Sequence, residues 1–137
     1  MYYFHIMDNT YSSNLTIIST ILITIVFIIS AIPKIINFQN TAFGLKSQLN
    51  SNMSMSLFML VIVIAIIIEL GGSLIVLYST ITSQYRMYAY YSVFGLIIFT
   101  TLATLIYHRS LVGNDYYAFF KNIAIIGGLL LLSEKLY

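Results

Sequence analysis

Four long runs of apolar residues dominate the chain, and the polar side chains gather mainly between them. The runs cover residues 15–34, 56–78, 89–107 and 116–133, and the fourth is the weakest because Lys121 and Asn122 interrupt it. About 20 apolar residues in a helix cross the hydrocarbon of a bilayer. Lipid offers no partner for exposed backbone amides, so each run predicts a transmembrane helix. The connections over 80–88 and 108–115 are short, which favours antiparallel neighbours. The pattern therefore predicts an all-α membrane protein, with residues 1–137 folded as a single antiparallel four-helix bundle.

The segment between the first two runs has a helical pattern of its own. Its apolar residues recur at spacings of three and four, which places them on one face of a helix: Ile35, Phe38, Ala42, Leu45 and Leu49. Polar residues occupy the other positions, so the segment predicts an amphipathic helix lying in the membrane interface. The alternative is an ordinary polar loop with scattered apolar residues.

Composition supports the membrane class. Of the 137 residues, 60% are hydrophobic and only 7% are charged, whereas a typical soluble domain is about 25% charged. The chain could not cover a water-exposed surface with polar groups, so we expect a multi-pass protein whose main partner is the lipid bilayer. The net charge of +2 is small and scattered, with no basic run, and therefore indicates no nucleic-acid partner.

The sequence contains few side chains that commonly catalyse reactions or bind metals, which argues against intrinsic catalysis. The absence of cysteine excludes disulfides, thiolate metal sites and cysteine nucleophiles in this chain. His5 precedes the first predicted helix and His108 ends the third, so an up-and-down bundle places the two histidines on opposite surfaces. We therefore expect no metal site and no cofactor chemistry within the chain, and an enzyme is the less favoured interpretation.

Glu69 lies where a charge is least expected, after eight aliphatic residues in the stretch VIVIAIIIELGG at 61–72. Residues three or four positions away share its helix face, and these are Ala65, Gly72 and Ser73. Small residues in membrane helices mark close helix contacts, so Glu69 is predicted to point into the bundle. A carboxylate at mid-membrane costs at least ~2.5–3.5 kcal/mol, so it should be protonated, solvated or paired.

Depth suggests which lysine pairs with Glu69. Glu69 follows Ser56 by 69 − 56 = 13 residues, which is roughly 20 Å from the first-loop side at about 1.5 Å per residue. Lys34 is expected at that surface, whereas Lys121 starts part-way into the fourth helix. We therefore predict Lys121 as the counter-ion and Lys34 as the second choice. Alternatively, Glu69 only pins helix packing through hydrogen bonds.

Other polar and small residues complete the predicted interior. His108 and Asn122 join Glu69, Lys121 and Lys34 in a predicted intramembrane polar pocket, although His108 taken alone is better explained as an interfacial polar residue. The small residues favour helix packing over phosphate binding, because no glycine-rich loop precedes them. The predicted packing positions are Ala65, Gly71, Gly72, Ser73, Ala124, Gly127 and Gly128.

Three stretches resemble the DoxX family of small four-helix membrane proteins, and the resemblance extends over nearly the whole chain. They are SAIPKIINF at 30–38, ELGGSLIVL at 69–77 and KNIAIIGGLLLL at 121–132. The family pattern is matched in the first stretch by Ala31 and Lys34, in the second by Glu69, Leu70, Gly71 and Gly72, and in the third by Asn122, Gly127 and Gly128, with His108 ending helix 3. One departure is the absence of the arginine with which many members begin helix 1.

The resemblance implies a four-helix bundle associated with membrane redox systems, because the family takes its name from subunits of a thiosulfate:quinone oxidoreductase. The leading hypothesis is a non-catalytic or accessory subunit, in a homo- or hetero-oligomer, whose polar pocket holds a quinone-like ligand. One alternative is a structural or assembly protein of a membrane-containing complex or particle, such as the inner membrane of a virion. Another is small-molecule or proton-linked transport through a Glu69–Lys121 pair. The native mass of the purified complex would separate a defined hetero-complex from a lattice or homo-oligomer.

Overall fold

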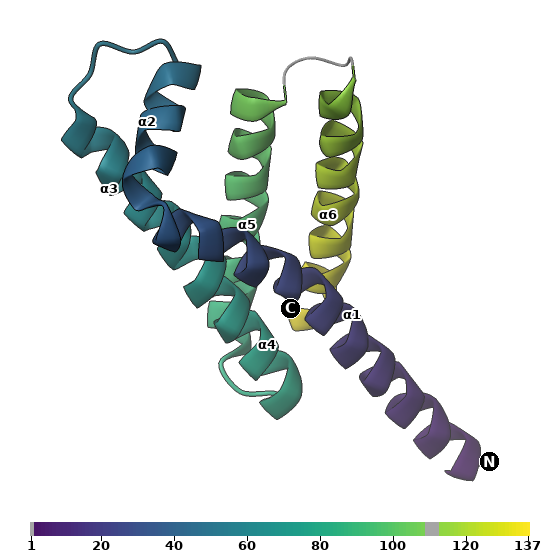
Figure 1. Cartoon of the computed structure of the whole chain (residues 1–137). Helices are drawn as coiled ribbons and strands as arrows, with labels where there is room; N and C mark the ends of the chain where they lie inside the picture. The colour runs from purple at the N-terminus through teal and green to yellow at the C-terminus, as the bar shows by residue number, and fades with distance from the viewer. Residues whose placement is uncertain (1, 109–112) are drawn as a thin grey trace.

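A computed structural model describes residues 2–108 and 113–137, with side chains described for residues 14–108, 113 and 115–137. Every regular element in these ranges is helical, and none of the described residues forms a strand (Figure 1). The elements in chain order are α1 (Tyr2–Ile36), α2 (Phe38–Gln48), α3 (Met55–Ile66), the π-helical turn η1 (Ile67–Gly72), α4 (Ser73–Thr82), α5 (Arg86–Tyr107) and α6 (Asn114–Leu136). The elements α3, η1 and α4 follow one another without a break and form the second long helix.

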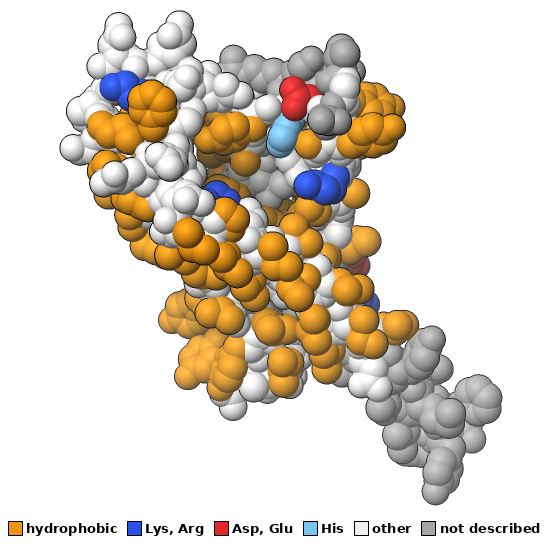
Figure 2. Space-filling view, viewed as in Figure 1, with side chains coloured by type: hydrophobic (Ala, Val, Ile, Leu, Met, Phe, Trp, Pro, Cys, Tyr) orange, Lys and Arg blue, Asp and Glu red, His pale blue; other side chains and the backbone are white. Residues whose placement is uncertain are grey.

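Among the described residues, four helices are long and apolar enough to cross a membrane, as the sequence predicts. The spans are Asn14–Ile36, Met55–Thr82, Arg86–Tyr107 and Asp115–Leu136. Most of each span is not covered by the rest of the molecule, and exposed apolar side chains include Ile18, Leu22 and Leu131. Figure 2 shows hydrophobic side chains over much of one face of the molecule. Water would solvate such a surface poorly. The length and the apolar composition of these helices are therefore those of a multi-pass integral membrane protein.

The long helices meet through a narrow core. α1 packs against α4 and η1, and α5 packs against α6, α4 and η1. Leu96 of α5, Val76 of α4 and Leu129 of α6 are fully buried where these helices meet, and Phe27 of α1 joins them. Because lipid tails are as apolar as these side chains, close packing rather than the hydrophobic effect stabilises such contacts in a membrane.

Only some of the small residues lie at close helix contacts. A Cβ added at Gly128 would lie 2.9 Å from Ile23 Cδ1, and one added at Gly72 would lie 3.6 Å from Leu96 Cγ, so these two glycines face neighbouring helices. Ala65 and Ser73 are also buried. For three other positions the packing role stays a prediction. A Cβ at Gly71 or Gly127 would meet nothing within 4 Å, and Ala124 is exposed; these positions lie on faces that no neighbouring helix covers.

The first connection contains a helix, so the alternative of an irregular polar loop is wrong for residues 38–48. α2 starts one residue after α1, with the break at Asn37. Ala42 and Leu45 of α2 pack against Phe58 and Ile62 of α3 and form a second buried cluster. The apolar face of α2 thus contacts protein.

Candidate functional site

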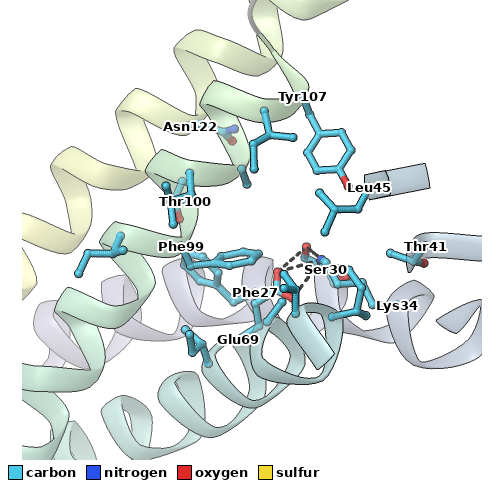
Figure 3. Close-up of a pocket in the computed structure, with 18 of the residues that line it drawn as sticks. Phe27, Ser30, Lys34, Thr41, Leu45, Glu69, Phe99, Thr100, Tyr107 and Asn122 are labelled. Carbon is cyan, nitrogen blue, oxygen red and sulfur yellow. Dashed lines mark hydrogen bonds and ion pairs between the residues drawn. The ribbon is translucent and has the colours of Figure 1, made fainter. Parts of the chain in front are cut away.

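A cavity of about 880 Å³ lies between the two halves of the fold. α1, α2, α3 and η1 form one side, and α5 and α6 form the other (Figure 3). Its walls are mostly apolar, with Phe27, Ile62 and Phe99 among the lining residues. Several lining residues are also exposed on the outside of the bundle, including Ile64 and Leu102. The cavity is therefore open towards the lipid-facing surface.

Glu69 lies at the polar end of this cavity. Its side chain is 0% exposed, as its small neighbours predict. Lys34 Nζ lies 3.0 Å from Oε1 and 3.0 Å from Oε2 of this carboxylate. Ser30 Oγ donates a hydrogen bond of 2.8 Å to Oε1. The acid is therefore paired with a lysine and also hydrogen-bonded, which offsets part of the cost of removing its charge from water.

The ammonium group of Lys34 is held on several sides. It donates to the backbone oxygen of Ser30 at 2.9 Å and to Ser30 Oγ at 2.8 Å, in addition to Glu69 Oε1. Its Nζ also lies 5.7 Å from the centre of the Phe99 ring, within range of a cation–π attraction. Three donors are present on an ammonium group, and all three have protein acceptors. The contact to Glu69 Oε2 lacks hydrogen-bond geometry, so charge alone holds that oxygen.

The prediction that Lys121 is the counter-ion, which came from depth in the membrane, is wrong. Lys34 pairs with Glu69, and Lys121 does not. The depth estimate assumed that α1 ends at the level where the second long helix begins. Instead α2 packs along α3, and the end of α1 packs against η1, where Ser30 and Lys34 bond to Glu69. Lys34 therefore reaches the acid directly. Lys121 is exposed and forms no ion pair with any described residue, although it also lines the cavity.

The remaining predicted pocket residues line the same cavity on the side of α5 and α6. Asn122 Nδ2 donates to Thr104 Oγ1 at 2.9 Å. His108 Nδ1 lies 3.4 Å from Asp115 Oδ1, and both side chains are partly exposed. All five predicted pocket residues thus line one cavity: Lys34, Glu69, His108, Lys121 and Asn122. Of these five, only Lys34 and Glu69 bond to each other.

Sequence reasoning missed several residues of the site. Ser30 lies one helical turn before Lys34, and this spacing was the available signal for its role. No such signal marked Phe99 of α5 or Thr41 and Gly44 of α2. These residues line the cavity only because of how the helices pack. The π turn at Ile67–Gly72, which carries Glu69, was also missed. Such turns occur frequently at functional sites.

The arrangement is suited to holding an amphipathic molecule. A mostly apolar wall with a few convergent polar groups is the usual make-up of a small-molecule site. Within the described ranges, no three His, Asp or Glu side chains come together in a way that could hold a metal ion. Comparison of the chain with protein-family models, with curated proteins and with solved structures finds no match. The resemblance to the DoxX family therefore stays a prediction that rests on three sequence stretches.

Proposed function

We propose that this chain is a DoxX-like membrane subunit that binds a quinone-like, membrane-soluble molecule in the cavity between its helices. In this proposal the four spans cross the bilayer alternately up and down. α2 lies at the membrane surface, with its exposed polar residues Gln39, Asn40 and Gln48 turned to the headgroups. The protein acts as an accessory component of a larger, redox-associated membrane complex.

The buried Lys34–Glu69 pair is the observation that carries the proposal. Packing alone does not require such a pair, because a buried ion pair can often be replaced by apolar residues without loss of stability. Ionisable residues within membrane spans are rare and usually mark a functional site. Here the pair lies at one end of an apolar cavity. A molecule with a polar ring and an apolar tail matches both parts of that surface.

The size of the cavity supports a small-molecule ligand. Sites for drug-sized molecules measure about 300–1,000 Å³, and this cavity measures about 880 Å³. Exposed apolar side chains such as Ile64 and Leu102 border it. A ligand dissolved in the bilayer therefore reaches the cavity from the side, and its tail remains in contact with lipid.

The accessory role is supported by how little of the described chain lies outside the spans. The second and third spans are joined by residues 83–85 alone. Among the described residues, α2 is the only separate helix outside the spans, and the start of α1, residues 2–13, precedes the first span. Surfaces for docking a soluble partner are therefore small. The likeness of three stretches to a family named for subunits of a quinone-linked enzyme agrees with such a role.

Ligand retention with a cavity-filling variant tests the proposal. Gly44 lines the cavity, and a Cβ added there meets nothing within 4 Å, so Gly44→Leu places a larger side chain at the cavity with room for its first carbon. Gly127→Leu is the matched control, because Gly127 is equally open but lies away from the cavity. In lipid nanodiscs, the wild type and Gly127→Leu should bind a short-chain quinone, and Gly44→Leu should bind it at least about tenfold more weakly. No binding by the wild type, or equal binding by all three proteins, would refute the proposal.

A further inference from the structure

We infer that the cavity takes a ligand whose head group is an ionised acid, and that Lys121, Tyr107 and Asn122 bind this head on the side of α5 and α6. The ligand class is then an apolar ring or tail that carries one negatively charged group. This inference rests on the proposed function, since it specifies the head group of the molecule in the same cavity. It follows from the charges and the donors in the cavity wall that the protein itself leaves unmatched.

One positive charge in the cavity wall has no matching negative charge. The lysine, histidine and acidic residues that line the cavity are Lys34, Glu69, His108 and Lys121. Lys34 and Glu69 neutralise each other in the buried ion pair. His108 lies 3.4 Å from the carboxylate of Asp115, which matches the charge of the ring whenever the ring is protonated. Lys121 has neither an ion pair nor a hydrogen bond with any described residue. The wall as a whole therefore favours a negatively charged ligand.

Two neutral donors on the same side of the cavity also lack a protein acceptor. Asn122 donates one of its two amide protons to Thr104 Oγ1 at 2.9 Å and keeps the other. The hydroxyl group of Tyr107 has no hydrogen bond with any described residue. Both side chains line the cavity, and Figure 3 shows the ring of Tyr107 extending from α5 towards Leu45 of α2. A ligand that brings acceptors therefore satisfies groups that the fold leaves unpaired.

The three donors belong to one small region of the fold. The bond from Asn122 to Thr104 joins α6 to the last turn of α5. Tyr107 follows Thr104 by three residues and shares its helix face. Lys121 is the neighbour of Asn122 in the chain, and its flexible stem carries the ammonium group to a nearby acceptor. Hydrogen bonds to an ionised acceptor are about twice as strong as those to a neutral one. One ionised head with several acceptor atoms therefore suits these donors better than a neutral carbonyl does.

The Lys34–Glu69 pair does not compete for the charged head. The three ammonium donors of Lys34 reach Ser30 O, Ser30 Oγ and Glu69 Oε1, and the hydroxyl of Ser30 donates to the same carboxylate. The carboxylate itself is fully buried and is neutralised by the lysine. The pair thus neither attracts nor repels a charge strongly. The charge of the ligand is directed to the side of α5 and α6, and the uncharged part of its ring faces the pair.

The test compares a hydroxynaphthoquinone that carries a short alkyl tail with its methyl ether, in nanodiscs of zwitterionic lipid that contain the full chain. The hydroxyl compound is an acid that is ionised at neutral pH, whereas the ether keeps the ring and the tail and has no charge. Dissociation constants are expressed per mole fraction of probe in the bilayer, which removes differences in partitioning. We expect the ionised probe to bind at least about tenfold more tightly than the ether.

Variants assign the preference to Lys121. Lys121→Met should weaken binding of the ionised probe at least about tenfold and leave binding of the ether nearly unchanged. Lys46→Met is the matched control, because Lys46 of α2 carries the same charge and does not line the cavity. This control should change neither affinity. Tyr107→Phe removes a neutral donor and should weaken binding of the ionised probe about threefold. An equal loss for both probes in Lys121→Met would overturn the inference, since a merely structural role gives that result.

A competition arm distinguishes two sources of the same chemistry. An ionised head on an apolar body occurs in acidic quinones and also in the fatty acids of a bilayer. A fatty acid added to the nanodiscs displaces the ionised probe if bilayer lipids supply the ligand, and leaves it bound if the site requires the acidic quinone ring.

The outcomes separate this inference from the proposed function. If the ether binds as tightly as the ionised probe, the preference for a charged head is wrong and the binding site stands. If neither probe binds, the proposed function fails and this inference fails with it.

Discussion

Lys34 and Glu69 lie 35 positions apart in the sequence and form an ion pair that joins the end of α1 to the π turn in the second span. The lysine is 20% exposed and the glutamate is fully buried. Ser30, one turn before Lys34, bonds to both partners. The pair therefore links two helices and at the same time gives the cavity its polar end.

Removing one partner should destabilise the fold more than removing both. Lys34→Met leaves a buried carboxylate without its counter-ion and should lower the free energy of unfolding by about 3 kcal/mol. The double variant Lys34→Met/Glu69→Gln should recover most of that loss. Unfolding in detergent micelles, analysed as a double-mutant cycle, measures the coupling between the two residues. Additive effects of the two single changes would show that the pair does not form.

Lys121 provides the matched control for the identity of the counter-ion. Its side chain is exposed and has no ion pair among the described residues. Lys121→Met should therefore change the free energy of unfolding by no more than about 0.5 kcal/mol. A loss from Lys121→Met as large as that from Lys34→Met would restore the sequence-based prediction that Lys121 pairs with Glu69.

Ser30 should matter far more than another serine of the same helix. Ser30→Ala removes a hydroxyl that donates to Glu69 and accepts from Lys34, and hydrogen bonds to charged groups contribute about 1.5–3 kcal/mol. Ser19 is exposed, and within the described part of the chain its hydroxyl bonds only to the backbone of its own helix. Thermal unfolding of Ser30→Ala and Ser19→Ala compares the two directly. Equal midpoints would mean that Ser30 does not support the ion pair.

Two adjacent glycines of α6 should respond differently to the same substitution. A side chain at Gly128 meets Ile23 of α1, with a Cβ only 2.9 Å from Cδ1, so Gly128→Leu should cost about 1–3 kcal/mol through overpacking. Gly127 faces open space, and Gly127→Leu should be neutral or slightly stabilising because leucine favours the helix. Unfolding in micelles checks both variants. A larger loss at Gly127 would contradict the contact between α1 and α6.

The sequence was sufficient for the parts of the fold that depend on local pattern. The four spans follow from the length of the apolar runs, and the inward direction of Glu69 follows from its small neighbours one turn away. Both predictions are confirmed, because lipid leaves a long apolar segment little choice but a helix. The helix over Phe38–Gln48 likewise shows in the spacing of its apolar residues.

The parts that depend on how helices meet were not predictable in this way. The partner of Glu69 was misassigned because the end of α1 lies beside η1, a packing arrangement that no local pattern shows. Small residues mark helix contacts only where a neighbour is present, so Gly72 and Gly128 could not be told from Gly71 and Gly127. The cavity itself is formed by five helices and the π turn, and emerges only from their arrangement.

Photoaffinity labelling tests the central claim most directly. A short-chain quinone that carries a photoreactive group is bound to the wild-type chain in nanodiscs, cross-linked by light, and located by mass spectrometry. The label should fall on cavity-lining residues such as Phe99 and Ile62, and excess quinone without the photoreactive group and the substitution Gly44→Leu should each strongly reduce it. Label distributed over lipid-facing residues such as Ile18 and Leu22, and insensitive to competitor, would contradict a binding site at the Lys34–Glu69 pair.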